Sequence, residues 1–147
     1  MKAIRLIALA ACMAATLDAS AQEQEIRLFS HRGGRMEHDE NTLSAFQASY
    51  DAGYRGFETD IRMTRDGALV ITHDSSLERT TDGTGTVEEK TEAEIRQLAT
   101  KQGNKMMFLD ELLEFLKGKE GLYVEFEMKT KPEALYPEER LHAYCDK

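Results

Sequence analysis

The stretch GFETDIRMTRDGALVITHD, residues 56–74, decides the fold that we expect for this chain. Residues 56–63 are rich in strand-forming side chains, and residues 68–72 form a second short apolar run. The triplet Arg-Asp-Gly at 65–67 lies between the two runs, and an Asp-Gly pair favours a tight turn. The pattern therefore predicts two strands joined as a hairpin.

Charged side chains occupy defined positions in this predicted hairpin. Glu58 and Asp60 are two residues apart, and a strand points residues i and i+2 to the same side of its sheet. His73 and Asp74 follow directly after the second strand. The carboxylates and the histidine are therefore candidates for a functional site at one end of the sheet.

Strands and helices alternate over the rest of the chain. Helices are predicted where apolar residues recur at helical spacing behind a capping residue such as Thr42 or Thr91. The predicted order is a strand at 26–29, a helix from 43 to a stop at Gly53, the hairpin, a helix from 91 with Ile95 and Leu98 on its apolar face, a helix at 109–116, a strand at 122–128 and a helix that starts near Pro137. This alternation is typical of an α/β fold with parallel strands and helical crossovers.

The composition is that of a soluble, globular chain, with 41% hydrophobic and 31% charged residues. The formal net charge is -8. An acidic chain does not attract phosphate backbones over long range, so we expect neither nucleic acid nor an anionic membrane surface as a partner. A phosphate-containing substrate would need local cationic groups or a bound metal.

The first residues of the chain, 1–21, have the pattern of a secretory signal peptide. A short basic start precedes an apolar run, and an Ala-x-Ala cleavage pattern ends at Ala21. The run is too short for a permanent transmembrane segment. An alternative is a lipoprotein box that ends at Cys12, which would carry a lipid anchor. We favour cleavage after Ala21, which leaves residues 22–147 as the mature domain, periplasmic or secreted.

The strand at 122–128 alternates apolar and polar residues, and Glu127 and Lys129 share its polar face. One interpretation is a half-exposed strand with solvated charges. The other follows from the fold, because parallel strands with crossover helices are usually covered on both faces, and buried charges then need partners or a metal. We favour the second, since side chains at the carboxyl ends of barrel strands face the active site.

Three carboxylates, those of Glu58, Asp60 and Glu127, could then meet at one end of the sheet. A ligand set made only of oxygen atoms favours a hard cation over zinc. The sequence therefore predicts one divalent cation, Ca²⁺ or Mg²⁺.

Histidines and cationic side chains lie close to the same predicted strand ends. His31 and His73 each follow a strand, and a pair of histidines can act as general acid and general base near neutral pH. Arg32 and Lys129 can hold anionic oxygens. Together with a metal, these groups suit attack at a phosphate ester. The sequence leaves open which histidine is the acid and which the base.

These residues resemble the motifs of the glycerophosphodiester phosphodiesterase family. A single HRG or ExD is a weak signal, but the ordered set covers nearly all of residues 28–129 and is highly specific. The matching segments, in chain order, are HRG (31–33), ENT with AF (40–42 and 45–46), ETD (58–60), TRDG (64–67), HD (73–74), LERTT (77–81), GTG (83–85) and EMK (127–129).

The resemblance implies a TIM-type (β/α)8 barrel and a phosphoric diester hydrolase. The implied reaction is metal-dependent hydrolysis of a small-molecule glycerophosphodiester to sn-glycerol 3-phosphate and an alcohol. By position, the implied roles are metal binding for Glu58, Asp60 and Glu127, acid/base catalysis for His31 and His73, phosphate binding for Arg32 and Lys129, and support of the site for Glu40 and Asn41.

Two features depart from the family pattern. Asp39 stands before Glu40 where many relatives have proline, and His38 precedes it at a position that we expect to be exposed. A complete barrel typically needs about 250 residues, and residues 22–147 are roughly half of that. We therefore expect a truncated barrel, the N-terminal part with roughly the first three strands.

Two alternative functions remain open at this point. A relative with the same site could act on a lysophospholipid or a phosphoinositol ester. A truncated fragment could also bind metal or phosphate without catalysis. His31 and His73 argue against the second alternative, because binding alone needs no acid/base pair.

Overall fold

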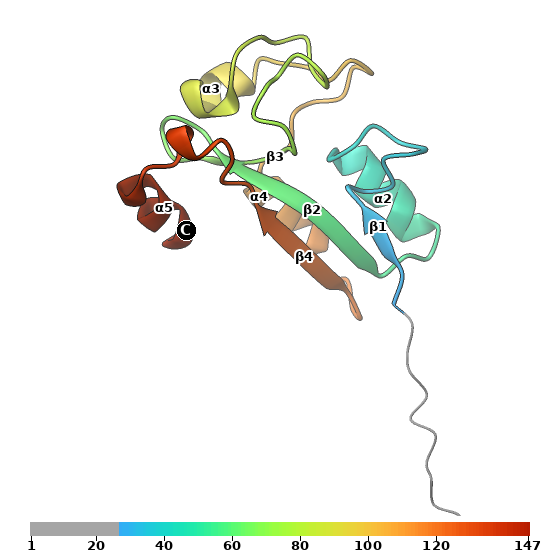
Figure 1. Cartoon of the computed structure of the whole chain (residues 1–147). Helices are drawn as coiled ribbons and strands as arrows, with labels where there is room; N and C mark the ends of the chain where they lie inside the picture. Colours follow the sequence, from blue (N-terminus) through green and yellow to red (C-terminus); the bar gives the residue numbers. More distant parts are fainter. Residues whose placement is uncertain (1–26) are drawn as a thin grey trace, which may run out of the picture.

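The computed structural model describes residues 27–147 of the chain (Figure 1). The predicted leader and Cys12 lie outside the described residues, so cleavage and lipidation stay predictions. Within residues 27–147, none of the helices combines the length and the apolar character that crossing a bilayer requires.

Strand β2 (Gly56–Met63) is the centre of a mixed sheet. Strands β1 (Phe29–His31) and β4 (Tyr123–Met128) both pair in parallel with the first residues of β2, so they lie on its opposite edges. Strand β3 (Leu69–Ile71) pairs antiparallel with the end of β2. Since Ile61 pairs with both β3 and β4, β3 lies on the same edge as β1. The predicted hairpin and the three parallel strands are confirmed.

The turn of the hairpin follows from its sequence. Gly67 has a φ of +88°, which a residue with a side chain rarely adopts. The hydroxyl of Thr64 donates to the Asp66 carboxylate at 2.7 Å and accepts from the backbone N–H of Ala68 at 2.9 Å. These contacts fix the register of β3, which in turn fixes where His73 leaves the sheet.

Helices flank the strands in the predicted order. Thr42 caps α2 by accepting from the backbone N–H of Ala45, and Thr91 forms a capping box with Glu94 at the start of α3. The helices are α2 (Leu43–Asp51), α3 (Glu92–Ile95), α4 (Leu109–Leu116) and α5 (Glu138–Cys145), with single 3-10 turns η1 (Val87–Glu89) and η2 (Glu133–Leu135).

The hydrophobic core lies on one face of β2. Phe57 and Ile61 of β2 share a buried cluster with Phe46 of α2 and Phe115 of α4, so both helices cover the same face of the sheet. The rings of Phe46 and Phe57 meet edge to face, with centroids 5.6 Å apart. Full burial of such a side chain stabilises a fold by roughly 1.5–3 kcal/mol. The alternate residues of β2 therefore point away from the helices, and these include both carboxylates.

Strand β4 is an edge of the sheet within the described residues, because it pairs only with β2. Phe126 and Met128 are the register partners of Thr59 and Ile61, which places them on the helix-facing side. They are nevertheless 38% and 42% exposed. An edge of this kind is where the next strand and helix of a barrel would pack.

Two predicted boundaries were wrong. β1 begins at Phe29 instead of lying within 26–29, because Phe29 is the residue whose backbone aligns with Gly56. The helix predicted from position 91 ends at Ile95, and Leu98 lies beyond it in a turn closed by its N–H bond to the Ile95 carbonyl.

Candidate active site

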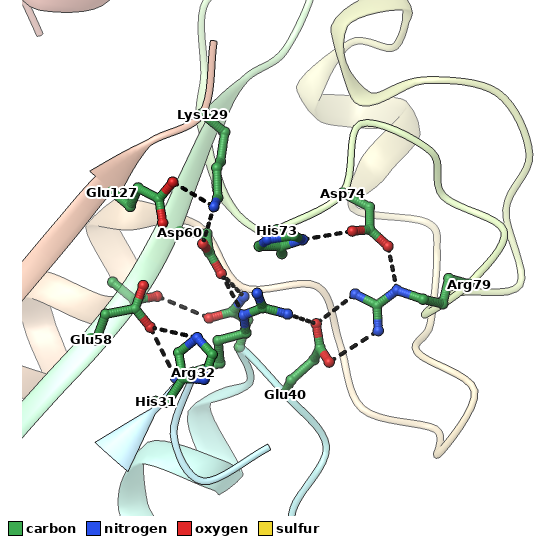
Figure 2. Close-up of polar contacts among 12 residues, drawn as sticks. His31, Arg32, Glu40, Glu58, Asp60, His73, Asp74, Arg79, Glu127 and Lys129 are labelled. Atoms are coloured by element: carbon green, nitrogen blue, oxygen red, sulfur yellow. Dashed lines mark hydrogen bonds and ion pairs between the residues drawn. The ribbon is translucent and has the colours of Figure 1, made fainter. Parts of the chain in front are cut away.

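The predicted site residues gather along the middle of β2, where β1 and β4 end beside it (Figure 2). β1 ends at His31, β2 carries the two carboxylates, and the loop after β3 carries His73. An open cavity of about 550 Å³ at this rim is lined by His73, Glu127 and Lys129, among others. Parallel pairing therefore brings together residues that are up to 98 positions apart along the chain, from 31 to 129.

Three carboxylates converge as the sequence predicts. Asp60 and Glu127 are register partners in β2 and β4, and Glu58 shares their face of the sheet. One oxygen of each residue lies within 4.8 Å of the others. Asp60 is fully buried, whereas the side chains of Glu58 and Glu127 are 15% and 57% exposed. The cluster is therefore buried on the β2 side and open to the cavity on the β4 side.

The arrangement fits a hard divalent cation. Oδ1 of Asp60 is buried and has no hydrogen-bond partner among the described residues, although Nζ of Lys129 lies 3.1 Å away. Burial raises the pKa of Glu58, and the negative charge of Asp60 raises it further. Lys129 also lies 2.6 Å from Glu127. Crowded carboxylates with a buried oxygen that lacks a donor are stabilised by a cation that takes oxygen ligands.

Arg32 is held on the carboxylate cluster by its backbone and its side chain. Its φ is +54°, and its backbone N–H donates to the Glu58 carbonyl at 2.9 Å. Nε lies 3.1 Å from the carboxylate of Asp60, and one terminal nitrogen donates to Glu40 at 3.2 Å. The side chain is only 8% exposed. Arg32 is therefore a buried cation beside the predicted metal ligands.

Asn41 supports the same cluster from the start of α2. Its φ is +59°, a left-handed conformation that Asn adopts more readily than most residues. Its amide nitrogen donates to Asp60 at 3.0 Å, and its amide oxygen accepts from the hydroxyl of Thr59 at 3.0 Å. Both ends of the amide are thus bonded, which fixes one oxygen of Asp60.

The two histidines differ in their surroundings. Nε2 of His31 lies 3.5 Å from Glu58, and half of the His31 side chain is exposed. Nδ1 of His73 lies 2.6 Å from the carboxylate of Asp74. Figure 2 shows His31 next to Glu58 and His73 on the side of Asp60 and Lys129. The imidazoles therefore lie on different sides of the carboxylate cluster (Figure 2).

Sequence reasoning missed two groups around the site. Arg79 joins Asp74 to Glu40, although the motif that contains it was noted only as a resemblance. Glu88 lies in η1, is only 3% exposed and accepts from Arg62 at 2.7 Å. Arg62 follows the two carboxylates on the same face of β2, and this inward position was the available signal that it needs an acidic partner.

Comparison with known proteins agrees with the motifs. The model of the glycerophosphoryl diester phosphodiesterase family matches residues 31–145. A glycerophosphodiester phosphodiesterase of Caldanaerobacter subterraneus is 36% identical over 123 residues, which cover 78% of this chain and 50% of the relative.

Solved structures share the fold. The crystal structure of a glycerophosphodiester phosphodiesterase from Agrobacterium tumefaciens matches with a TM-score of 0.67 and 29% identity, over 83% of this chain and 63% of that one. A phosphodiesterase of Oleispira antarctica, solved in complex with the product sn-glycerol-3-phosphate, matches with a TM-score of 0.65 and 31% identity, over 71% and 44%. The chain thus spans about half the length of the relatives it matches, and its open sheet corresponds to part of their barrel. It belongs to the glycerophosphoryl diester phosphodiesterase family.

Proposed function

We propose that the full-length protein hydrolyses glycerophosphodiesters to sn-glycerol 3-phosphate and an alcohol. The observation that carries this proposal is the convergence of Glu58, Asp60 and Glu127, within 4.8 Å of one another, beside two histidines and two cationic side chains. The names of the related enzymes support the same substrate class.

The three carboxylates hold one divalent cation in this proposal. When bound, Ca²⁺ or Mg²⁺ would neutralise negative charge on the phosphoryl oxygens. Arg32 and Lys129 add positive charge on the Asp60 side of the cluster, from 3.1 Å each. Charge that is fixed in place before the reaction stabilises the transition state without reorganisation.

The histidines move the protons. One imidazole accepts a proton from the attacking hydroxyl, of water or of the substrate's own glycerol, and the other donates a proton to the departing alcohol. Asp74 occupies Nδ1 of His73, so Nε2 of His73 is the atom that exchanges the proton. His31 would act through an imidazole that is half exposed beside Glu58.

We also propose that the protein is exported, because residues 1–21 carry a basic start, an apolar run and a small-residue cleavage pattern. Intact-mass analysis of the protein from the periplasm or the medium tests this. A mature chain that starts at Gln22 supports the proposal, a lipidated Cys12 supports the anchored alternative, and an uncleaved cytoplasmic chain contradicts both.

The experiment that tests the proposed reaction is release of glycerol 3-phosphate from glycerophosphocholine by the full-length protein. We expect release that stops after chelation and returns when a divalent cation is restored. Lysophosphatidylcholine and a glycerophosphoinositol serve as competing substrates. Faster turnover of either would identify that compound as the preferred substrate of the same phosphodiester hydrolysis. Release of glycerol 3-phosphate that persists after chelation would contradict the proposed role of the cation.

A further inference from the structure

The candidate site has two parts that come from different segments. The carboxylates lie on the sheet, in β2 and β4, whereas His73 and Asp74 lie in the loop that follows β3. Reaction at one phosphate requires these parts to keep a fixed separation, because small errors in geometry cost large factors in rate. The backbone of this loop is held at the sheet, because the Thr72 N–H donates to the Asp60 carbonyl at 3.0 Å and Nε of Arg62 donates to the His73 carbonyl at 2.9 Å. These contacts fix the main chain, and the orientation of the His73 imidazole depends on its side-chain contact with Asp74.

Arg79 joins the two parts through its guanidinium (Figure 2). Nε pairs with one oxygen of Asp74. Both terminal nitrogens donate to Glu40, at 3.0 and 2.7 Å. Glu40 in turn accepts from Arg32 at 3.2 Å, and Arg32 reaches Asp60. A continuous row of alternating charges therefore runs from His73 to the predicted metal ligand Asp60.

From Arg79 onward, burial increases toward the carboxylate cluster. The side chain of Arg79 is 48% exposed, that of Glu40 is 14% exposed, and that of Asp60 is fully buried. Arg79 is the most exposed member of the row and lies in the loop after β3, whereas Asp60 lies buried in β2. Arg79 thus ties a surface loop to a rigid element, as a positioning group does.

Only a guanidinium can make this set of contacts from one side chain. Its planar fork offers five N–H donors, so it can bind one carboxylate through two nitrogens and a second through Nε. A lysine ammonium is a single point charge and cannot hold both partners in a fixed plane. The contacts of Arg79 with Asp74 and Glu40, which we call the Arg79 bridge, therefore fix the orientation of both carboxylates as well as balance their charge.

Both partners of Arg79 remain ionised at neutral pH. The hydrogen bonds from Arg79 are the largest cause that lowers the pKa of Glu40. Burial raises the pKa of Asp74, but hydrogen bonds from Arg79 and His73 outweigh burial and bring it to about 2. An ionised carboxylate can only accept, so the contact at 2.6 Å places the hydrogen on Nδ1 of His73.

We propose that Arg79 is a positioning residue for the reaction: it orients Asp74, and through Asp74 it holds His73 in the Nδ1–H tautomer, with Nε2 directed to the substrate side. This proposal rests on the proposed function for its kinetic consequence only. If Asp74 does not hold the hydrogen on Nδ1, the imidazole can carry it on Nε2 instead. Nε2 can then no longer accept a proton from the substrate side.

The test combines two readouts on the full-length protein. Two-bond ¹H–¹⁵N correlation spectra of the histidine side chains report which ring nitrogen carries the hydrogen, and glycerophosphocholine kinetics report kcat and KM. The variants are Arg79→Gln and Arg79→Lys, with Asp74→Asn as a break at the other end of the bridge. The control is Arg96→Gln, because Arg96 is also a partly exposed arginine with carboxylate partners, Glu92 and Glu111.

We expect wild type and Arg96→Gln to show His73 as the Nδ1–H tautomer. Arg79→Gln and Asp74→Asn should show a mixture of tautomers, with kcat lowered about 10- to 100-fold and KM changed less than about threefold. Arg79→Lys should recover part of kcat. A single Nδ1–H tautomer with unchanged kcat in Arg79→Gln would overturn the proposal, and so would an equal effect in Arg96→Gln.

The spectra separate this proposal from the proposed function. If wild type releases no glycerol 3-phosphate, the proposed function fails, while the tautomer of His73 still tests the bridge without any substrate. If Arg79→Gln lowers the midpoint of thermal unfolding, spectra recorded below that temperature still report the tautomer of His73. The spectra of Asp74→Asn provide a second, independent readout.

Discussion

Asp60 of β2 and Glu127 of β4 are register partners in neighbouring parallel strands, and an oxygen of each lies within 4.8 Å of the other and of Glu58. A slip of one residue in this pairing would turn Glu127 to the opposite face of the sheet. The cation site therefore depends on the register of β4, which is set by its pairing with β2 and by the packing of Val124 on the core.

Alanine at either histidine should separate catalysis from metal binding. His31→Ala and His73→Ala each remove a proton-transfer group, so we expect kcat to fall by about 10²- to 10⁴-fold. Neither residue is among the three predicted oxygen ligands, so cation affinity should change by less than about threefold. Steady-state kinetics and calorimetric titration measure the two effects. Retained turnover in both variants would show that other groups move the protons.

Asn41 should support cation binding through Asp60. Its amide nitrogen holds one oxygen of Asp60 at 3.0 Å, and loss of such an outer contact typically weakens metal binding by about 10- to 100-fold. Asn41→Gly is the suitable change, because glycine tolerates the φ of +59° without strain. Calorimetric titration measures the affinity, with Gln97→Gly as the control, because Gln97 also carries a neutral amide but lies exposed in the turn after α3. If Asn41→Gly binds the cation as tightly as wild type, Asn41 does not support cation binding.

Glu88 should matter for stability because it neutralises a buried arginine. It accepts from Arg62 at 2.7 Å, from Tyr136 at 2.8 Å and from Ser75 at 2.7 Å. Removing one partner of a buried ion pair costs about 3 kcal/mol or more, so Glu88→Gln should lower the free energy of unfolding by that order. Glu89→Gln, one residue further and exposed, should change it by less than about 0.5 kcal/mol. Urea unfolding followed by circular dichroism compares the two, and equal effects would contradict a buried pair.

The same carboxylate predicts how stability depends on pH. Burial raises the pKa of Glu88, but hydrogen bonds from Ser75, Tyr136 and Arg62 outweigh it and hold the pKa below its ordinary value of 4.5. A carboxylate with a lower pKa in the folded state stabilises the fold above the unfolded-state pKa, and this contribution is lost as the pH falls through the folded-state pKa. The free energy of unfolding should therefore decrease as the pH drops below about 4.5.

Glu88→Gln should have a flatter pH dependence than wild type in that window, because the titrating group is gone. Asp74 has a pKa of about 2, so its own contribution to the free energy of unfolding should be lost at lower pH, and equally in both proteins. Unfolding curves recorded between neutral pH and pH 3 provide the comparison. Identical slopes for wild type and Glu88→Gln would show that Glu88 does not carry this dependence.

The sequence predicts most of the fold because local signals and packing agree. The Asp-Gly turn, the caps at Thr42 and Thr91 and the alternation of β4 all appear where the patterns indicate. The ends of elements are less predictable, since they depend on pairing partners. β1 starts at Phe29 because β2 aligns there, and this alignment is not visible in the residues of β1 alone.

The chemistry-bearing residues of the site could be predicted, but their mutual contacts could not. Spacing along β2 places Glu58 and Asp60 on one face, and a parallel partner then brings Glu127 to them. The bridge from Arg79 to Glu40 joins positions 39 apart through two loops, and no periodicity encodes such a contact. Burial of Glu88 likewise depends on how η1 packs against the end of β2.

Titration of Ca²⁺ and of Mg²⁺ into chelator-treated, full-length protein tests the central claim most directly. Wild type should bind a single cation, and Glu58→Gln, which replaces a charged oxygen by a neutral amide, should bind it at least about tenfold more weakly, a change of 1.4 kcal/mol or more. Glu120→Gln is the matched control, because Glu120 is exposed in the turn before β4 and lies outside the three-carboxylate cluster. Its affinity should stay within about threefold of wild type. A Glu58→Gln protein that binds both cations as tightly as wild type would contradict the account.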